Sequence, residues 1–525
     1  MRTMREGEAS PDEVAFLSPE PVQIPSGGIG KYVPGGRNVM AGRYIHSEGY
    51  PPFPNRARFV DTLTGTWYHM GRQFGERSGD ATRCVSDIWW KEQCGRWGKA
   101  ETLKAMELYE AQIRAFDPNL IAFMKGIADG ASPWLNQSRY ADRRDTLCST
   151  SYQRVMSVNI YDEWTMHHPR HFPDGSSTYG GSQAAPVETC VAMCSGFSAR
   201  GQATSRGEVI AAHNRHCDYN PRCYEQVYII RPDDGNACWV LTNCPQVAAN
   251  QVVNDKGVSI ALFAGGHTNP SSLDYRGASY RAEGFGIPWF HLFLYVGVHA
   301  CTAKEAIEML TLGIPEYRDR TGRKTLLCGG GWIFMVTDEE TLAVVEVTAD
   351  RYAVRHAGEF TGMDWTDTNS IVATNHNLCD SSYDRDNHLT DVPMTIFGDG
   401  YRRDPETGDV TGLNDSGVRF WTLMWDIKYH YGRIDRYRAQ RIMSGLYAYD
   451  RDTGKKIECA QDETGIWRVW GTVEPCNQGK TTLEGGSADG KVAVLEGAQS
   501  AVYWTLGTPS HWEGAWDAYH FARGV

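Results

Sequence analysis

The chain has 525 residues, enough for two or three average domains or for one large body with insertions. Its 52 basic and 64 acidic side chains give a net charge of -12, which argues against nucleic acid as the main partner. No apolar run approaches the ~18 residues of a membrane span, and the polar N-terminal region shows no secretory signal. We therefore expect a cytoplasmic enzyme.

The 14 cysteines are scattered and form no CxxC pair. Cysteines in such a distribution are more often small buried hydrophobes than disulfides. We expect no disulfide framework, no bound metal and no cofactor.

The first part of the chain divides into a polar arm and a helical region. Residues 1–60 lack periodicity and are predicted to wrap the body or to be partly disordered. From residue 65 to about 129, apolar side chains recur at three- and four-residue spacings, which predicts amphipathic helices packed on a sheet. Asp117 and Pro118 end one helix and begin the next.

Residues 154–164, RVMSVNIYDEW, form a strand candidate, and a loop with His167, His168 and His171 follows. This histidine cluster suits a metal site or an exposed loop. We favour the loop, because HHxxH lacks the helix and the carboxylate that a zinc-hydrolase motif requires.

The stretch from Glu188 to Asn220 holds the first candidate for chemistry. It begins as a strand, turns at residues 205–207 and returns as a second strand that ends in polar side chains. Adjacent antiparallel strands can bring Cys194 and Asp218 together, as a nucleophile and its orienting group require. Cys190 is an alternative nucleophile, but it lacks the Ser-Gly pattern that follows Cys194.

The same stretch also permits a zinc site. Sulfur and imidazole groups, which are zinc ligands, gather there at His213, His216, Cys217 and Cys223. On a strand His213 and His216 point to opposite faces, so we favour the nucleophile over the metal site.

Downstream, short strands alternate with turn signals and give way to helices. The predicted strands are 208–216, 224–232, 236–244 and 257–266, which form an antiparallel meander, and then 330–338 and 342–350. Thr302 and Glu305 form a capping box that predicts a helix start, and residues 418–446 have a helical pattern. Strands bracketed by helices predict an α+β fold.

Taken together, these segments resemble the cysteine N-terminal-nucleophile (Ntn) hydrolases typified by acyl-coenzyme A:isopenicillin-N acyltransferase. The resemblance is carried first by Met193-Cys194-Ser195, by Ala203-Thr204 and by the AHNRHCDY run at 212–219. Further segments that look like the family follow in its order: 65–76, 125–132, Asn159 with Ile160 as the strand before the nucleophile, 253–262, 302–311, ATNHN at 373–377, and 486–493.

The resemblance implies a four-layer αββα sandwich with an N-terminal helical region, cut between Met193 and Cys194. The cut would leave Cys194 with a free α-amine, whose ordinary pKa of ~7.7 to 8.0 suits it to take the thiol proton. It would divide the body into residues 61–193 and 194–525, which stay associated, with 456–525 a C-terminal extension of the same body.

The family pattern also implies roles for polar residues. Asp218 resembles the aspartate that holds the α-amine, and Asn375 matches the asparagine whose amide donates to the tetrahedral oxyanion. Asn214 would orient the substrate or the cysteine backbone. Residues 215–217 stand between Asn214 and Asp218 where relatives have a single residue, which leaves open which polar group faces the site.

Substrate contacts depart further from the family. Relatives often carry an arginine soon after the Gly-x-Pro that is 286–288 here, whereas this chain continues WFHLFLYV. Arg419 is therefore a candidate for binding a substrate carboxylate. His216 and His376 are further candidates for substrate binding, with a structural role as the alternative for His376.

We therefore expect a self-processing amidohydrolase or N-acyltransferase that acts on the C–N bond of a small acyl amide, or on an acyl thioester, through a thioester on Cys194. One alternative is a phospholipase-B-like deacylase of lipid esters, which shares the AHN-type run. Another is an uncleaved binding protein of the same fold. A homodimer is the expected assembly.

Overall fold

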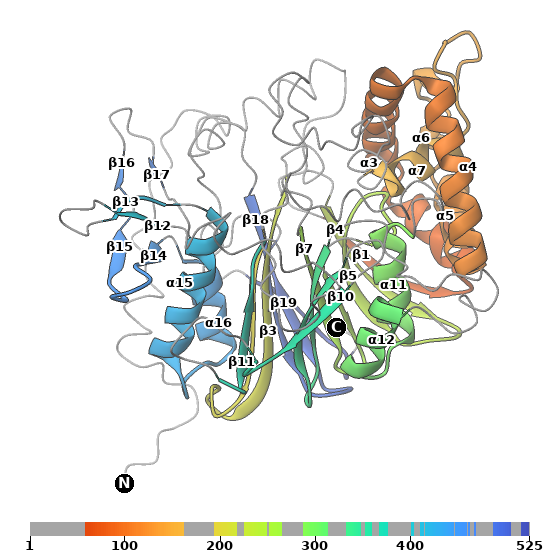
Figure 1. Ribbon diagram of the computed structural model, residues 1–525. Coiled ribbons are helices and arrows are strands. Elements are labelled where there is room, and N and C mark those ends of the chain that lie inside the picture. Colours follow the sequence, from red (N-terminus) through yellow and green to blue (C-terminus); the bar gives the residue numbers. More distant parts are fainter. Residues whose placement is uncertain are drawn as a thin grey trace, which may run out of the picture.

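The computed structural model describes residues 58–161, 194–217, 225–248, 251–264, 287–312, 332–347, 352–359, 367–375, 401–403, 410–413, 415–445, 447–458, 460–461, 467–468, 487–505 and 516–523. In this part of the chain, two large β-sheets pack face to face and helices cover the outer face of each (Figure 1). The predicted α+β fold with its four αββα layers is confirmed.

The larger sheet has eight strands in the order β1-β4-β5-β6-β7-β8-β9-β10. They are β1 (Arg58–Gly65), β4 (Glu225–Pro232), β5 (Cys238–Asn243), β6 (Gln251–Asn254), β7 (Ser259–Ala264), β8 (Trp332–Thr337), β9 (Leu342–Val347) and β10 (Tyr352–His356). Neighbouring strands are antiparallel except β1 and β4, which are parallel. Because β1 precedes Cys194 and β4 follows it, this pairing joins the two halves of the chain in one sheet.

The second sheet has six strands in the order β11-β2-β3-β18-β19-β20. They are β11 (Ser370–Ala373), β2 (Cys194–Gly201), β3 (Gly207–Cys217), β18 (Ser487–Leu495), β19 (Ala501–Trp504) and β20 (Asp517–His520). β18 pairs antiparallel with β3 over its whole length. The last part of the chain therefore contributes to the sheet that carries Cys194.

Small two-stranded sheets complete the described strands. They pair β12 (Tyr401–Arg403) with β13 (Val410–Leu413), β14 (Tyr447–Tyr449) with β15 (Lys456–Glu458), and β16 (Ala460–Gln461) with β17 (Trp467–Arg468).

The helices form the two outer layers (Figure 1). The eight-stranded sheet is covered by α3 (Trp67–Trp97), α4 (Lys99–Phe116), α5 (Pro118–Gly130), α6 (Ser132–Leu135), the 3-10 helix η2 (Arg139–Ala141), α7 (Ser151–Asn159), α11 (Trp289–His299) and α12 (Ala303–Leu312). The six-stranded sheet is covered by α15 (Asp415–His430) and α16 (Arg436–Met443). As predicted, α4 ends and α5 begins at Asp117, whose side chain accepts from the backbone N–H of Asn119 at 2.9 Å.

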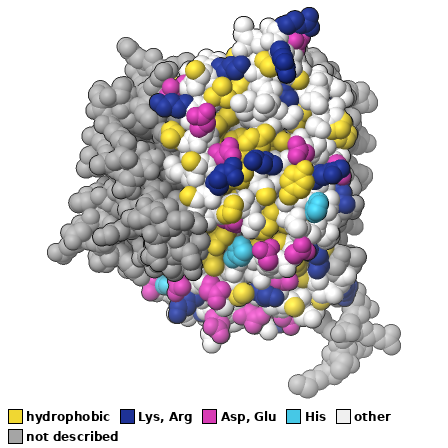
Figure 2. Space-filling model, turned by 90° about the vertical axis from the view of Figure 1, so that its right-hand side faces the viewer, with side chains coloured by type: hydrophobic (Ala, Val, Ile, Leu, Met, Phe, Trp, Pro, Cys, Tyr) yellow, Lys and Arg dark blue, Asp and Glu magenta, His cyan; other side chains and the backbone are white. Residues whose placement is uncertain are grey.

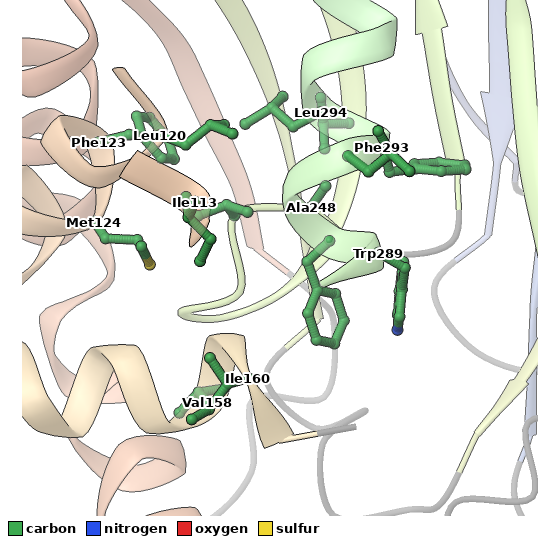
Figure 3. Packing of buried hydrophobic residues seen from close by; sticks show 14 of the residues in the cluster. Ile113, Leu120, Phe123, Met124, Val158, Ile160, Ala248, Trp289, Phe293 and Leu294 are labelled. Carbon is green, nitrogen blue, oxygen red and sulfur yellow. The ribbon is translucent and has the colours of Figure 1, made fainter. Parts of the chain in front are cut away.

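Three hydrophobic cores hold the layers together. The first lies under α3–α7, α11 and α12 and contains side chains from helices far apart in sequence, such as Ile113, Met124 and Phe293 (Figure 3). The second lies between the sheets and includes Cys194, Val227 and Trp239. The third lies between the six-stranded sheet and α15 and α16. Since apolar burial is the main favourable term in folding, each layer is stabilised by its neighbours.

Helices α3 and α5 approach each other unusually closely. A Cβ added at Gly71 or Gly75 of α3 would lie 2.0 or 2.2 Å from a backbone oxygen of α5, and Gly126 of α5 meets α3 in the same way. Glycine at these positions lets the two backbones touch, so the α3–α5 contact depends on the absence of side chains.

The predicted strand at 154–164 is wrong. Residues up to Asn159 form helix α7, which begins with a capping box between Thr150 and Gln153. All residues from Arg154 to Asn159 are buried in the helical layer. Because the polar residues Arg154, Ser157 and Asn159 are buried together with the apolar ones, they do not mark a solvent-facing side, which is the signal that distinguishes a helix from a strand.

The downstream predictions are largely confirmed. Strands 330–338 and 342–350 correspond to β8 and β9, the helix after Thr302 is α12, and residues 418–446 hold α15 and α16. The meander differs in one respect, because its first strand, β3, belongs to the other sheet. There β3 has neighbours on both edges, β2 and β18, so no edge remains for β4.

The outer face of the α3–α7 layer carries acidic and basic side chains interspersed with apolar ones (Figure 2). The large hydrophobic side chains exposed in the described part of the chain are Leu108, Tyr429 and Tyr437. None of the helices whose placement is given combines the length and the apolar character of a membrane span.

Candidate active site

Cys194 is the first residue of β2, in the sheet whose strands β11 and β3 flank it. Its side chain is fully buried and belongs to the core between the two sheets. Strand alternation places Ser198 on the same side, where its hydroxyl bonds Thr337 of β8 at 2.6 Å, and turns Ser195 and Phe197 toward the helices α15 and α16. Cys194 is thus held on a strand that has a fixed partner on either side.

Asn375 lies just beyond the end of β11 and contacts the backbone of Cys194. Its Oδ1 accepts a hydrogen bond from the Cys194 nitrogen at 2.7 Å. The same Oδ1 accepts from Nη2 of Arg419 at 2.7 Å. Because a guanidinium group only donates, this contact fixes which end of the Asn375 amide faces Cys194. The amide nitrogen, which the oxyanion prediction requires as donor, is the other end of the group.

Arg419 of α15 organises the residues around Cys194. It is fully buried, and its Nη1 donates to the backbone oxygen of Cys194 and to Oγ of Ser195, the latter at 2.8 Å. With the bond to Asn375, one guanidinium ties the nucleophile strand, the segment after β11 and helix α15 together. Three of its hydrogen bonds thus hold the backbone and the polar neighbours of Cys194, which favours a positioning role; the binding of a substrate carboxylate stays a prediction.

Arg215 is a site residue that sequence reasoning missed. It lies directly opposite Cys194 in the β2–β3 pairing, and directly opposite residues of an antiparallel pair share a face. It is 4% exposed, and its Nη1 donates to Oδ1 of Asn243 on β5 at 2.9 Å. The strand alternation could have found it, since Arg215 and His213 fall on one face of β3 and Asn214 on the other.

Asn214, predicted as catalytic, lies opposite Ser195 on the face that packs against α15 and α16. It is fully buried, and its Nδ2 donates to the backbone oxygen of Met443 at the end of α16 at 2.7 Å. The sheet therefore separates the Asn214 side chain from the Cys194 side chain, which favours a role in positioning β3 and α16. A catalytic role for Asn214 stays a prediction.

His213 is bonded within the core between the sheets. Its Nε2 contacts the backbone oxygen of Leu262 at 3.0 Å, and its Nδ1 contacts Nε2 of Gln251 at 2.8 Å. Burial, followed by the charges of Lys491 and Arg215, holds the pKa of His213 well below its ordinary value, although the Leu262 contact opposes this. A neutral imidazole with protein partners at both ring nitrogens explains His213 without a metal. No group of three or more potential metal ligands occurs among the residues whose placement is given.

Lys491 of β18 lies opposite His213, two residues along the strands from the position where Cys194 faces Arg215. It is fully buried, and its Nζ donates to Oγ of Ser259 on β7 at 2.8 Å. Burial lowers the pKa of the Lys491 ammonium group from 10.5 to about 7. The interior below the site thus contains a lysine that loses its proton near neutral pH.

Several predicted residues lie outside the described part of the chain. These are Met193, Asp218, His376, the loop with His167, His168 and His171, and the alternative ligands or nucleophiles Cys190 and Cys223. Of His216 and Cys217 only the backbone, in β3, is described. Their predicted roles stay predictions.

The arrangement can perform nucleophilic chemistry. A thiol stands at the start of a strand, the nitrogen of the same residue is held by an amide oxygen, and two guanidinium groups lie on the adjoining strand and helix. Cations near a thiol favour the thiolate, and they also favour a negatively charged tetrahedral oxygen. The set can therefore supply a thiol for nucleophilic attack together with positive charge.

Comparison with known proteins finds no matching family model and no matching curated sequence. Among solved structures, a mutant conjugated bile acid hydrolase from Clostridium perfringens has 14% identity and a TM-score of 0.36, covering 63% of this chain and 93% of that one. The Caenorhabditis elegans ortholog of N-acylethanolamine-hydrolyzing acid amidase has 14% identity and a TM-score of 0.30, covering 48% and 86%. At these TM-scores the likeness does not establish a shared fold. The fold of this chain is established by its own sheets and hydrophobic cores.

Proposed function

We propose that this protein is a self-processing Ntn hydrolase whose nucleophile is Cys194 and which cleaves or transfers the acyl group of a small N-acyl amide. The observation that carries the proposal is the bond from the Cys194 nitrogen to Asn375, whose amide is fixed in turn by Arg419. Any buried backbone N–H needs an acceptor, and here that acceptor is a side-chain oxygen just beyond the end of β11. This oxygen can accept equally from a free α-amine, which is what the proposal requires.

Activation begins at the bond between Met193 and Cys194. The thiol attacks the Met193 carbonyl carbon, the peptide nitrogen leaves that carbon and takes up a proton, and water hydrolyses the resulting thioester. The products are a carboxylate at Met193 and a free α-amine and thiol at Cys194. Asn375 then faces an amine in place of an amide, and its oxygen can accept from it as before.

The α-amine supplies the base for turnover. Its ordinary pKa of ~7.7 to 8.0 is close to the working pH, so it can take the thiol proton as sulfur bonds the substrate carbonyl carbon. The tetrahedral intermediate collapses, and the ammonium group returns the proton to the leaving amine. Water, or an acceptor amine, then attacks the thioester, and its proton passes through the α-amine back to the sulfur.

The protein's own groups act on charge and geometry in this cycle. Arg215 provides positive charge on the face of the sheet that carries the Cys194 side chain, and Arg419 positions Asn375 and the Cys194 backbone. Asn375 holds the α-amine and donates to the oxyanion, and Asp218 helps to hold the amine. One oxyanion donor contributes on the order of 3 kcal/mol to the transition state.

The two fragments remain one protein after the cut. β1, from the N-terminal fragment, pairs with β4 of the C-terminal fragment, and their helices share the first hydrophobic core. A layer buried this extensively does not dissociate in water, because separation exposes both apolar faces.

Turnover tests the proposal directly. The purified protein is incubated with a panel of N-acyl amides, and released amine and acyl-Cys194 peptide are measured by mass spectrometry beside Cys194→Ala. We expect amine release and an acyl group on Cys194 in the wild type alone. Hydrolysis of lipid esters without turnover of amides would contradict the amidase proposal and favour the lipid deacylase.

A further inference from the structure

Arg355 crosses from one sheet to the other near the candidate site. It belongs to β10, the edge strand of the eight-stranded sheet, and is 5% exposed. Its cross-strand partner Val344 lies in the core between the sheets, so Arg355 points into that core. There its Nη2 donates to the backbone oxygen of Val372 on β11 at 2.7 Å. A buried guanidinium thus joins the edges of the two sheets.

The Val372 backbone oxygen does not take part in the hydrogen bonds between β11 and β2. The backbone N–H of Arg200 donates to the oxygen of Asn369 at 2.8 Å, one register step beyond β11. Hydrogen-bonded pairs alternate along an antiparallel ladder, so the pair of Val372 with Phe197 falls between two such pairs. The Val372 carbonyl therefore points away from β2, at the free edge of the sheet, and Arg355 is its partner.

The hydrogen bond from Arg355 holds a short strand whose end must be placed accurately. β11 is four residues long, and among the strands that the structure describes it pairs with β2 alone. Asn375, which holds the Cys194 nitrogen, lies just beyond its last residue. A short edge strand frays easily, and a shift of about 1 Å in a positioned group can cost 100-fold in rate. Holding Val372 in place therefore also holds the end of β11 from which Asn375 extends.

A buried carboxylate accompanies Arg355. Glu346 of β9 is 1% exposed, and its partners across the sheet are Ile333 and Ala353. It lies diagonal to Arg355 on the face that Ile333 and Val344 present to the core, a relation within reach of long side chains. Burying a guanidinium without a counter-charge is costly, and Glu346 is placed within reach to supply one.

We propose that Arg355 is a positioning residue for the Cys194 site: by anchoring the free edge of β11 to the eight-stranded sheet, it holds Asn375 against the Cys194 nitrogen. This inference rests on the proposed function for its catalytic consequence. Its structural part stands independently, since it concerns the position of β11 in the uncut chain.

The test compares Arg355→Met with a matched control, Arg154→Met. Arg154 is likewise a buried arginine that donates to a backbone oxygen, that of Leu135 at 2.8 Å, but it lies in α7 of the helical layer. Both changes are made in the uncut Cys194→Ala chain, and hydrogen exchange is followed by mass spectrometry. We expect exchange at residues 370–373 and at residue 194 to quicken about tenfold or more in Arg355→Met only. Equal exchange of these amides in the two variants would overturn the anchor.

The catalytic part is measured in the self-cleaving chain. Arg355→Met should lower kcat about 10- to 100-fold with KM changed less than about threefold, and Arg355→Lys, which keeps a donor, should recover part of the loss. Arg154→Met should retain kcat. Faster exchange without a fall in kcat would overturn the positioning role. If the wild type turns over no acyl amide, the proposed function fails, while the exchange result still decides whether Arg355 holds the site.

Discussion

Asn214 and Arg215 are adjacent in β3, yet the sheet separates their side chains. Arg215 shares a face and a register position with Cys194, whereas Asn214 bonds the end of α16. The choice between these two neighbours depends on strand register, because a slip of one residue exchanges the faces.

Substitution of Arg215 and of Asn214 therefore compares the two faces of the six-stranded sheet directly. Arg215→Met should lower kcat by about 100-fold, since it removes a positive charge from the face of the sheet that carries the Cys194 side chain. Asn214→Ala should reduce the free energy of unfolding by about 1 kcal/mol through the lost bond to Met443, with a smaller loss of kcat. Steady-state kinetics and denaturant unfolding measure the two effects. An equal loss of kcat in both variants would contradict the assignment of the faces.

At the scale of single elements, the contact between α3 and α5 sets a steric limit. A Cβ at Gly71 would lie 2.0 Å from the backbone oxygen of Phe123, whereas a Cβ at Gly95, in the same helix, meets nothing within 4 Å. We expect Gly71→Ala to destabilise the protein by about 1–3 kcal/mol or more. Gly95→Ala should stabilise it by up to about 1 kcal/mol, because alanine is the better helix former.

Thermal or denaturant unfolding of the two glycine variants decides the point. If Gly71→Ala were as stable as Gly95→Ala, the close approach of the two helices would be wrong.

The strand β18 carries a second element-scale prediction, in the pH dependence of stability. Burial lowers the pKa of Lys491 from 10.5 to about 7, so between these values the unfolded chain binds the proton that the folded chain has released. Stability therefore rises with pH through this window, by up to about 1.4 kcal/mol per pH unit, and the penalty of the buried cation is fully present below it.

Lys491→Met removes this titration. The loss of the bond to Ser259 adds only a cost that does not depend on pH. Urea unfolding at pH 7, 8 and 9 should therefore show that the free energy of unfolding of the wild type increases relative to that of the variant as the pH rises. Parallel pH dependences for the two proteins would show that Lys491 keeps its ordinary pKa in the folded state.

At the scale of the whole molecule, the layers followed from the sequence more readily than their contacts. Alternating strands, a capping box at Thr302 and an apolar periodicity in 418–446 are local patterns, and they predicted α12, α15 and α16 and most of the strands correctly. Helix α7 was missed, because its polar residues are buried with its apolar ones and therefore do not mark a solvent-facing side. The separation of β3 from the following strands depends on pairing with β18, 270 or more residues away, which no local pattern records.

In the candidate site, too, local motifs were predictable and long-range contacts were not. Cys194 and Asn375 were proposed from their motifs, and the structure brings them within hydrogen-bond distance. The hydrogen bonds of Arg419 could not be predicted from the sequence, because they join α15, β2 and the segment after β11, which are far apart along the chain. Arg215 required the register of a pairing that the sequence suggests without fixing.

The central claim is that Cys194 becomes the N-terminal nucleophile of a cut chain, and intact-mass spectrometry of the purified wild type beside Cys194→Ala tests it most directly. The account predicts two wild-type fragments of roughly 22 and 37 kDa, the larger beginning with Cys194, and a single chain in the mutant. A wild-type protein that stays in one piece under native conditions would have no α-amine at Cys194 and would contradict the account.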